Sequence, residues 1–134
     1  FPAYKEDRVI VASIQSFLEQ DYPKELYEII VISDQMRPET NDALAALPIR
    51  LLMANYKESS KAKALAMAMD SIDTNAFDIV VIMDADNMTT PDFLSTINRV
   101  FDRGTPYRKE SEHRHFRTRQ RQRRNKQWIL PQRT

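Results

Sequence analysis

The chain has 134 residues, 42% of them hydrophobic and 29% charged, a composition typical of one globular domain with a core of its own. The absence of cysteine excludes disulfides and thiolate metal sites, and no apolar run approaches the roughly 20 residues that cross a bilayer. The net charge of +1 conceals a net of −7 over residues 1–106 and +8 over residues 107–134, so the chain joins two segments of different character.

The amino-terminal end gives little sign of targeting. The chain opens on Phe1-Pro2-Ala3-Tyr4, without an initiator methionine or a basic leader. We expect this to be the end of a strand, and an upstream strand or anchor to belong to the parent protein. Together with the lack of cysteine, this favours a cytoplasmic location, either free or at the cytoplasmic face of a membrane in the parent.

Strand and helix patterns alternate along residues 1–106. This alternation predicts an α/β fold, a parallel sheet with helices on both faces. No Gly-x-Gly-x-x-Gly follows the first strand and no Walker A motif is present, which disfavours the usual dinucleotide and P-loop folds. The elements predicted in chain order are a strand end at 1–4, a helix that ends before Asp21, a strand at 27–34, a helix at 38–48, a strand at 49–53, a helix at 61–69 capped by Ser59 or Ser60, a strand at 79–83 and a helix with Thr90 as N-cap.

The stretch at residues 79–87 is the centre of the functional argument. Five apolar residues predict a strand buried on both faces, and Asp84 and Asp86 follow where that strand should stop. Ligands of open α/β sheets bind beyond the carboxyl ends of the strands, and paired acids there offer oxygen ligands to Mg²⁺ or Mn²⁺. Such a metal can hold a diphosphate. The simpler alternative is that both acids only form a turn.

The tail, residues 107–134, is rich in arginine and poor in aliphatic residues. It fits a disordered basic arm that binds nucleic acid, a segment that faces anionic lipid, or an out-of-frame end foreign to the fold. We favour the last, because the tail begins where another strand is due. We therefore expect no specific nucleic-acid partner, and keep a nucleic-acid-binding module acting through the tail as the alternative function.

Residues 1–106 resemble the family 2 glycosyltransferases of the GT-A fold, over their nucleotide-sugar-binding half-domain. The resemblance rests on several short motifs in the right order. They are Pro2-Ala3-Tyr4-Lys5-Glu6, Ser16-Phe17-Leu18-Glu19-Gln20-Asp21-Tyr22-Pro23, Glu28-Ile29-Ile30-Val31-Ile32-Ser33-Asp34, Lys61-Ala62-Lys63-Ala64-Leu65 and the Asp-x-Asp motif Asp84-Ala85-Asp86 followed by Pro91-Asp92.

The resemblance implies a role for eight residues in binding a nucleotide sugar, most simply a UDP-sugar. Pro2, Ala3 and Tyr4 would border the base, with Tyr4 stacked on it, while Glu6 would lie near the ribose. Asp34 would accept a hydrogen bond from the base.

The remaining implied roles concern the diphosphate and the metal. Lys61 would approach the base or the phosphates, and Asp84 would bind the ribose or the sugar. Asp86 would ligate Mn²⁺ or Mg²⁺ and so assist catalysis, because the metal neutralises charge on the leaving diphosphate.

Several departures limit what this chain can do. Lys5, Ser33, Ser60 and Ala66 stand where the family usually has Asn, Asp, Gly and Asn. The family's later general base and its acceptor-binding half should lie beyond residue 106, and Trp128 does not complete the family's Gln-x-x-Arg-Trp motif. We therefore expect a transferase fragment of polysaccharide biosynthesis that binds its donor without turnover. The acceptor would be a saccharide or a lipid-linked sugar.

Overall fold

The computed structural model describes residues 1–103, 117–120 and 126–129. A parallel sheet has the order β1-β2-β3, with β1 at Pro2–Tyr4, β2 at Ile30–Asp34 and β3 at Arg50–Ala54. β3 pairs with β2 along all five of its residues, whereas β1 pairs only with the last three. The three strands therefore end level with one another, at Tyr4, Asp34 and Ala54.

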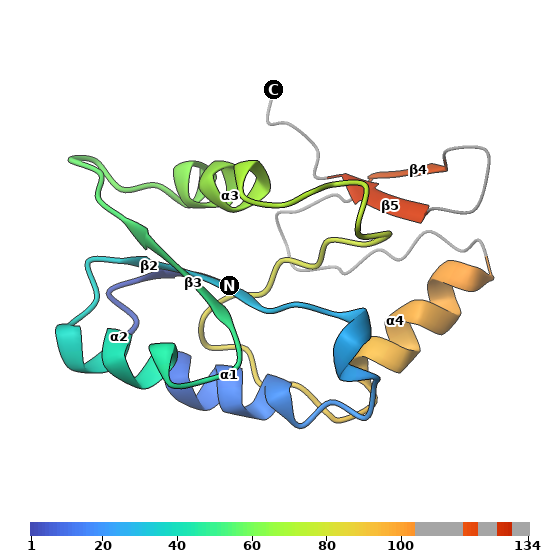
Figure 1. The fold of residues 1–134 in the computed structure, drawn as a ribbon, viewed down its shortest axis with the longest axis horizontal. Coiled ribbons are helices and arrows are strands. Elements are labelled where there is room, and N and C mark those ends of the chain that lie inside the picture. The colour runs from blue at the N-terminus through green and yellow to red at the C-terminus, as the bar shows by residue number, and fades with distance from the viewer. Residues whose placement is uncertain (104–116, 121–125, 130–134) are drawn as a thin grey trace.

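Helices cover both faces of this sheet, as predicted (Figure 1). α1 (Ile10–Leu18) and α2 (Pro38–Ala45) lie on one face, and α3 (Lys61–Asp70) lies on the other. The alternation of β2 explains the two layers, because successive side chains of a strand point to opposite faces. Val31 joins a buried cluster with α1 and α2, while Ile32 packs with Ala64 and Ala68 of α3.

Phe17 of α1 connects the sheet to the last helix, α4 (Phe93–Asp102). Its ring makes edge-on contacts with Phe1, Tyr27 and Phe93, at centroid distances of 5.5, 6.2 and 5.9 Å. Such edge-to-face contacts add to the burial of the rings. One side chain thus ties the start of the chain to residues more than seventy positions later.

The helix starts are partly as predicted. Ser60 is the N-cap of α3, where its hydroxyl accepts a hydrogen bond from the Lys63 amide at 3.1 Å. The prediction of Thr90 as N-cap of α4 is wrong. Asp92 holds that position, and the Thr90 hydroxyl instead donates to the Asp92 carboxylate at 2.6 Å.

The predicted strand at residues 79–83 is also wrong. These residues pair with no strand in the part of the chain that the structure describes. Only Met83 is buried and the other four are half-buried, so burial on both faces is not found. A segment becomes a strand only through ladder hydrogen bonds, and neither edge of the sheet, β1 or β3, forms a ladder with residues 79–83. The strand predicted at 27–34 is likewise shorter, since β2 begins at Ile30.

The tail contains two short strands, where irregular chain was expected. β4 (Arg117–Gln120) and β5 (Lys126–Ile129) form an antiparallel pair. The arginine side chains on which nucleic-acid binding would depend lie outside the described residues. Of the helices in the described ranges, none combines the length and the apolar character that a membrane span requires.

Candidate functional site

The carboxyl edge of the sheet is shaped by two sharp bends. Lys5, directly after β1, and Gln35, directly after β2, both have a φ of 53°. The Lys5 amide donates to the Asp34 carbonyl at 3.1 Å, which holds the two bends side by side. A non-glycine residue in the left-handed region costs about 1 kcal/mol, and such strained residues cluster at binding sites. The bends turn the chain away directly after the two strands.

Tyr4 and Asp34 are direct partners across this edge. Asp34 is only 3% exposed, and within the described structure its Oδ1 has no hydrogen-bond partner. Tyr4 is 48% exposed, with the Lys5 ammonium 5.2 Å from its ring centre. We call this pair the ladder edge. It offers a flat, partly exposed ring beside a buried acceptor.

The other residues predicted near the base differ in their exposure. Ala3 is buried in the core, and Pro2 is half-buried, paired with Ile32. Glu6 is exposed, and its carbonyl accepts the first amides of α1. Ala3 and Glu6 therefore support the bend after β1 through packing and backbone hydrogen bonds.

Asp7 has a structural role that the sequence did not indicate. Its Oδ1 accepts hydrogen bonds from the Thr40 hydroxyl at 2.6 Å and from the Arg37 amide at 2.8 Å. The bond from Thr40, followed by the amide of Arg37, lowers the pKa of Asp7. This carboxylate joins the loop after β1 to the start of α2. No spacing motif links residues 7 and 40, so only the folded chain reveals the contact.

The second pair of predicted residues meets across two segments. Lys61, the first residue of α3, forms an ion pair with Asp84. Their side chains are 34% and 50% exposed. The lysine lies just beyond the carboxyl end of β3, so the ion pair brings Asp84 to the same end of the sheet as the ladder edge.

Asp84 and Asp86 belong to a tight turn, residues 84–87, which we call the acidic turn. The Asn87 amide donates to the Asp84 carbonyl at 3.0 Å, and Ala85 is buried between the two acids. Both carboxylates are consequently exposed. The turn predicted by the simpler interpretation is present, and it presents two acids rather than burying them.

The oxygen ligands of the acidic turn suit a metal that is shared with a ligand. The described residues contain no group of three or more His, Cys, Asp or Glu side chains that could hold a metal ion by themselves. Mg²⁺ commonly takes only one or two carboxylates and completes its shell with water and substrate phosphates. Asp86, with Asp84 beside it, fits that arrangement.

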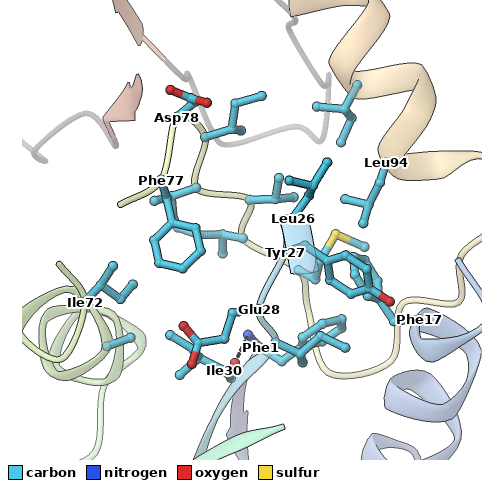
Figure 2. Close-up of a pocket in the computed structure, with 18 of the residues that line it drawn as sticks. Phe1, Phe17, Leu26, Tyr27, Glu28, Ile30, Ile72, Phe77, Asp78 and Leu94 are labelled. Atoms are coloured by element: carbon cyan, nitrogen blue, oxygen red, sulfur yellow. Dashed lines mark hydrogen bonds between the residues drawn. The ribbon is translucent and has the colours of Figure 1, made fainter. Parts of the chain in front are cut away.

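The cavity of about 330 Å³ shown in Figure 2 is separate from these carboxylates. Apolar side chains around the start of β2 and residues 79–83 form most of its lining, and none of Tyr4, Asp34, Asp84 or Asp86 lines it. The amino group of Phe1 donates to the Ile30 carbonyl at 2.9 Å there. Burial, helped by the charge of Lys61, lowers the pKa of this amine from 8.0 to about 5. The cavity has the character of a gap in the core.

Comparison with known proteins decides the family. Residues 1–132 match the family model described as glycosyl transferase family 2. The chain belongs to glycosyltransferase family 2. The family model runs beyond residue 106, into the arginine-rich tail. The resemblance that the short motifs indicated is therefore confirmed.

Two curated relatives and one solved structure agree with this assignment. The chain is 28% identical to the probable glycosyltransferase YdaM of Bacillus subtilis (strain 168), over 64% of this chain and 21% of that protein. It is 26% identical to a Methanococcus voltae glucuronosyltransferase, over 76% of this chain and 32% of that protein. The chain thus spans a fifth to a third of the relatives it matches.

The crystal structure of S. aureus TarS 1-349 is similar in fold. It superposes with a TM-score of 0.65 and 19% identity over 76% of this chain and 31% of that one. The similarity confirms the predicted fold class, a partial GT-A fold with a parallel sheet between flanking helices.

Proposed function

We propose that this chain is the donor-binding part of a family 2 glycosyltransferase and takes a nucleoside diphosphate sugar, preferably a UDP-sugar, together with Mn²⁺ or Mg²⁺. The sugar would pass to a hydroxyl of a saccharide or a lipid-linked acceptor, as in polysaccharide biosynthesis. The Methanococcus voltae relative supports the lipid-linked class, since its name combines a dolichyl N-acetyl-α-D-glucosaminyl phosphate with a glucuronosyltransferase. The chain spans only part of its relatives, and what we propose for it is donor binding.

The buried Oδ1 of Asp34 is the observation that carries the proposal. An unpartnered buried acceptor costs about 1–3 kcal/mol, which a ligand N–H can recover. The imide N–H of uracil is such a donor and is carried by a flat ring. The half-exposed ring of Tyr4 lies directly beside Asp34 and supplies a surface on which that base can stack.

The acidic turn and Lys61 would receive the rest of the donor. Asp86 would ligate the metal, and Asp84 would hold the ribose or the sugar. When bound, the metal would stabilise the negative charge of the diphosphate. The Lys61 ammonium would exchange part of its contact with Asp84 for a phosphate oxygen, which is likewise a charged acceptor. Pro2, Ala3 and Glu6 would border the base-binding region formed by Tyr4 and Asp34.

Calorimetric titration with UDP tests this proposal. We expect UDP to bind more tightly with Mn²⁺ than without it, and Asp86→Ala to abolish that difference. Asp34→Asn should weaken UDP binding about tenfold with or without metal, because it replaces a charged acceptor of the base. Asp42→Asn, an exposed acid on α2, is the matched control and should change neither. Equal UDP affinity with and without metal in the parent chain would contradict the proposal.

A further inference from the structure

The end of α1 makes side-chain hydrogen bonds to the segment that follows the acidic turn. Gln20 is 4% exposed, just after α1. Its Nε2 donates to the Thr90 carbonyl at 2.7 Å and to the Thr89 hydroxyl at 3.3 Å, while its Oε1 accepts from the Leu94 amide at 2.9 Å. One buried amide thus has three contacts with the chain leading into α4.

Ser16, one turn earlier on α1, forms hydrogen bonds with the same segment. Its hydroxyl donates to the Thr89 carbonyl and accepts from the Thr89 amide, both at 3.1 Å. The Asp21 amide adds a bond to the Pro91 carbonyl at 2.8 Å. We call the side chains of Ser16 and Gln20 the α1 clamp.

The α1 clamp matters because, in the described ranges, no strand ladder holds the acidic turn, which the Lys61–Asp84 ion pair also supports. Residues 79–83, which lead into it, pair with no strand in the described ranges. The turn is anchored on one side by the buried Ala85 and on the other by Thr89, three residues after Asp86. Asp86 lies between these two anchors in the chain. The Ala85 anchor is a methyl group in the core, and the Thr89 anchor is held by the α1 clamp.

We propose that Ser16 and Gln20 are positioning residues that fix the acidic turn, and through it the metal-binding Asp86, by hydrogen-bonding the backbone of residues 89–94. The metal role rests on the proposed function, whereas the ordering of the turn stands independently of it. Neither side chain is placed against donor or metal. Their effect passes through the backbone, so they set how well Asp86 is oriented.

The first experiment measures hydrogen exchange of the amides of residues 84–90 in the full chain, with the β1–β2 amides as an internal reference. Gln20→Met keeps the length of the side chain but removes its polar atoms. We expect exchange in the acidic turn to rise at least tenfold, with the reference amides unchanged. Ser16→Ala should raise it about threefold. Unchanged exchange at residues 84–90 in Gln20→Met would overturn the proposal.

Two matched controls lie on α1 itself. Ser13→Ala makes the same chemical change as Ser16→Ala, at a buried hydroxyl that has no hydrogen-bond partner within the described structure. Gln15→Met makes the same change as Gln20→Met at an exposed position. Both should leave exchange in the acidic turn within twofold of the parent. A general weakening of α1 would raise exchange in the controls as well, and would overturn the specific role.

The second experiment separates positioning from stability by UDP titration. For Gln20→Met we expect the affinity for UDP without metal to stay within twofold of the parent. The increase in UDP affinity produced by Mn²⁺ should fall at least tenfold. If the gain is kept although exchange rises, the clamp orders the turn without positioning the metal ligand, and the metal part of the proposal fails. If the parent itself shows no gain with Mn²⁺, the proposed function fails, and the exchange experiment still decides whether the clamp orders the turn.

Discussion

The ladder edge and the acidic turn both bring acids to the end of the sheet, but they are held by different forces. At the ladder edge, backbone pairing between β1 and β2 fixes Tyr4 against Asp34, and the carboxylate is buried. The acidic turn has no ladder partner in the described residues and keeps both of its carboxylates exposed. Its position depends on a buried alanine, an ion pair and the hydrogen bonds from Ser16 and Gln20.

Under the proposed function, this difference would suit the two regions to different parts of a nucleotide sugar. Base recognition needs an acceptor whose position is fixed before binding, which a backbone ladder provides. A metal and a diphosphate need charged, hydrated ligands that can adjust their contacts. A region held by a few side chains is also the easier one to disturb without unfolding the sheet. Mutations and pH can therefore act on the two regions separately.

Replacing Phe17, whose ring packs against Phe1 before β1 and Phe93 at the start of α4, should have the largest effect. Phe17→Ala removes ring contacts to Phe1 and Phe93 at once and leaves a cavity in the core. Such truncations cost about 3–5 kcal/mol. Urea unfolding should show that loss, with the ladder edge and the acidic turn lost together. A loss below about 1 kcal/mol would mean that the two regions do not share this core.

Lowering the pH should have the next largest effect on stability, through the amine of Phe1, the residue before β1. The pKa of the Phe1 amine is about 5 in the folded chain against 8.0 as its ordinary value, so between those pH values the unfolded chain binds more protons. Stability should therefore rise as pH rises from about 5 to 8, by roughly 1.4 kcal/mol per unit at most. Urea unfolding at several pH values measures this slope. Acetylation of the amine should abolish it, and a slope that persists after acetylation would assign it to other groups.

Removing the ion pair at the acidic turn should have the smallest effect on stability. Lys61 and Asp84 are both partly exposed, and exposed pairs contribute about 0–1 kcal/mol. Lys61→Met should therefore lower the free energy of unfolding by less than about 1 kcal/mol, measured by urea unfolding. A loss above about 2 kcal/mol would show that this ion pair, rather than the hydrogen bonds from α1, is the main support of the turn.

Much of the fold was predictable because local signals and burial agree. The apolar spacing that includes Ile10, Ile14 and Phe17 predicted α1, and the short apolar runs predicted β2 and β3 to within a few residues. The hydroxyl of Ser59 or Ser60 was predicted to cap α3, and the structure has Ser60 in that position. Residues 79–83 were predicted wrongly, since an apolar run shows that a segment prefers burial but does not provide a ladder partner.

The candidate site was predictable in its residue types and less so in its contacts. Asp34 and Asp84 were identified by their positions after apolar runs, and the structure places both at the carboxyl end of the sheet. The contacts of Asp7 with Thr40 and of Gln20 with Leu94 could not be predicted. They join positions 33 and 74 residues apart, and no short motif encodes them.

The sequence by itself determined the family resemblance, the parallel α/β arrangement and the acid at the end of β2, because these follow from motifs and periodicities confined to short stretches. Only the tertiary structure decided that Asp34 is buried with an unpartnered oxygen, that Lys61 reaches Asp84, and that α1 holds the segment behind Asp86. The physical reason is that burial and long-range hydrogen bonds depend on which segments pack together. Packing is a property of the whole chain rather than of any short stretch.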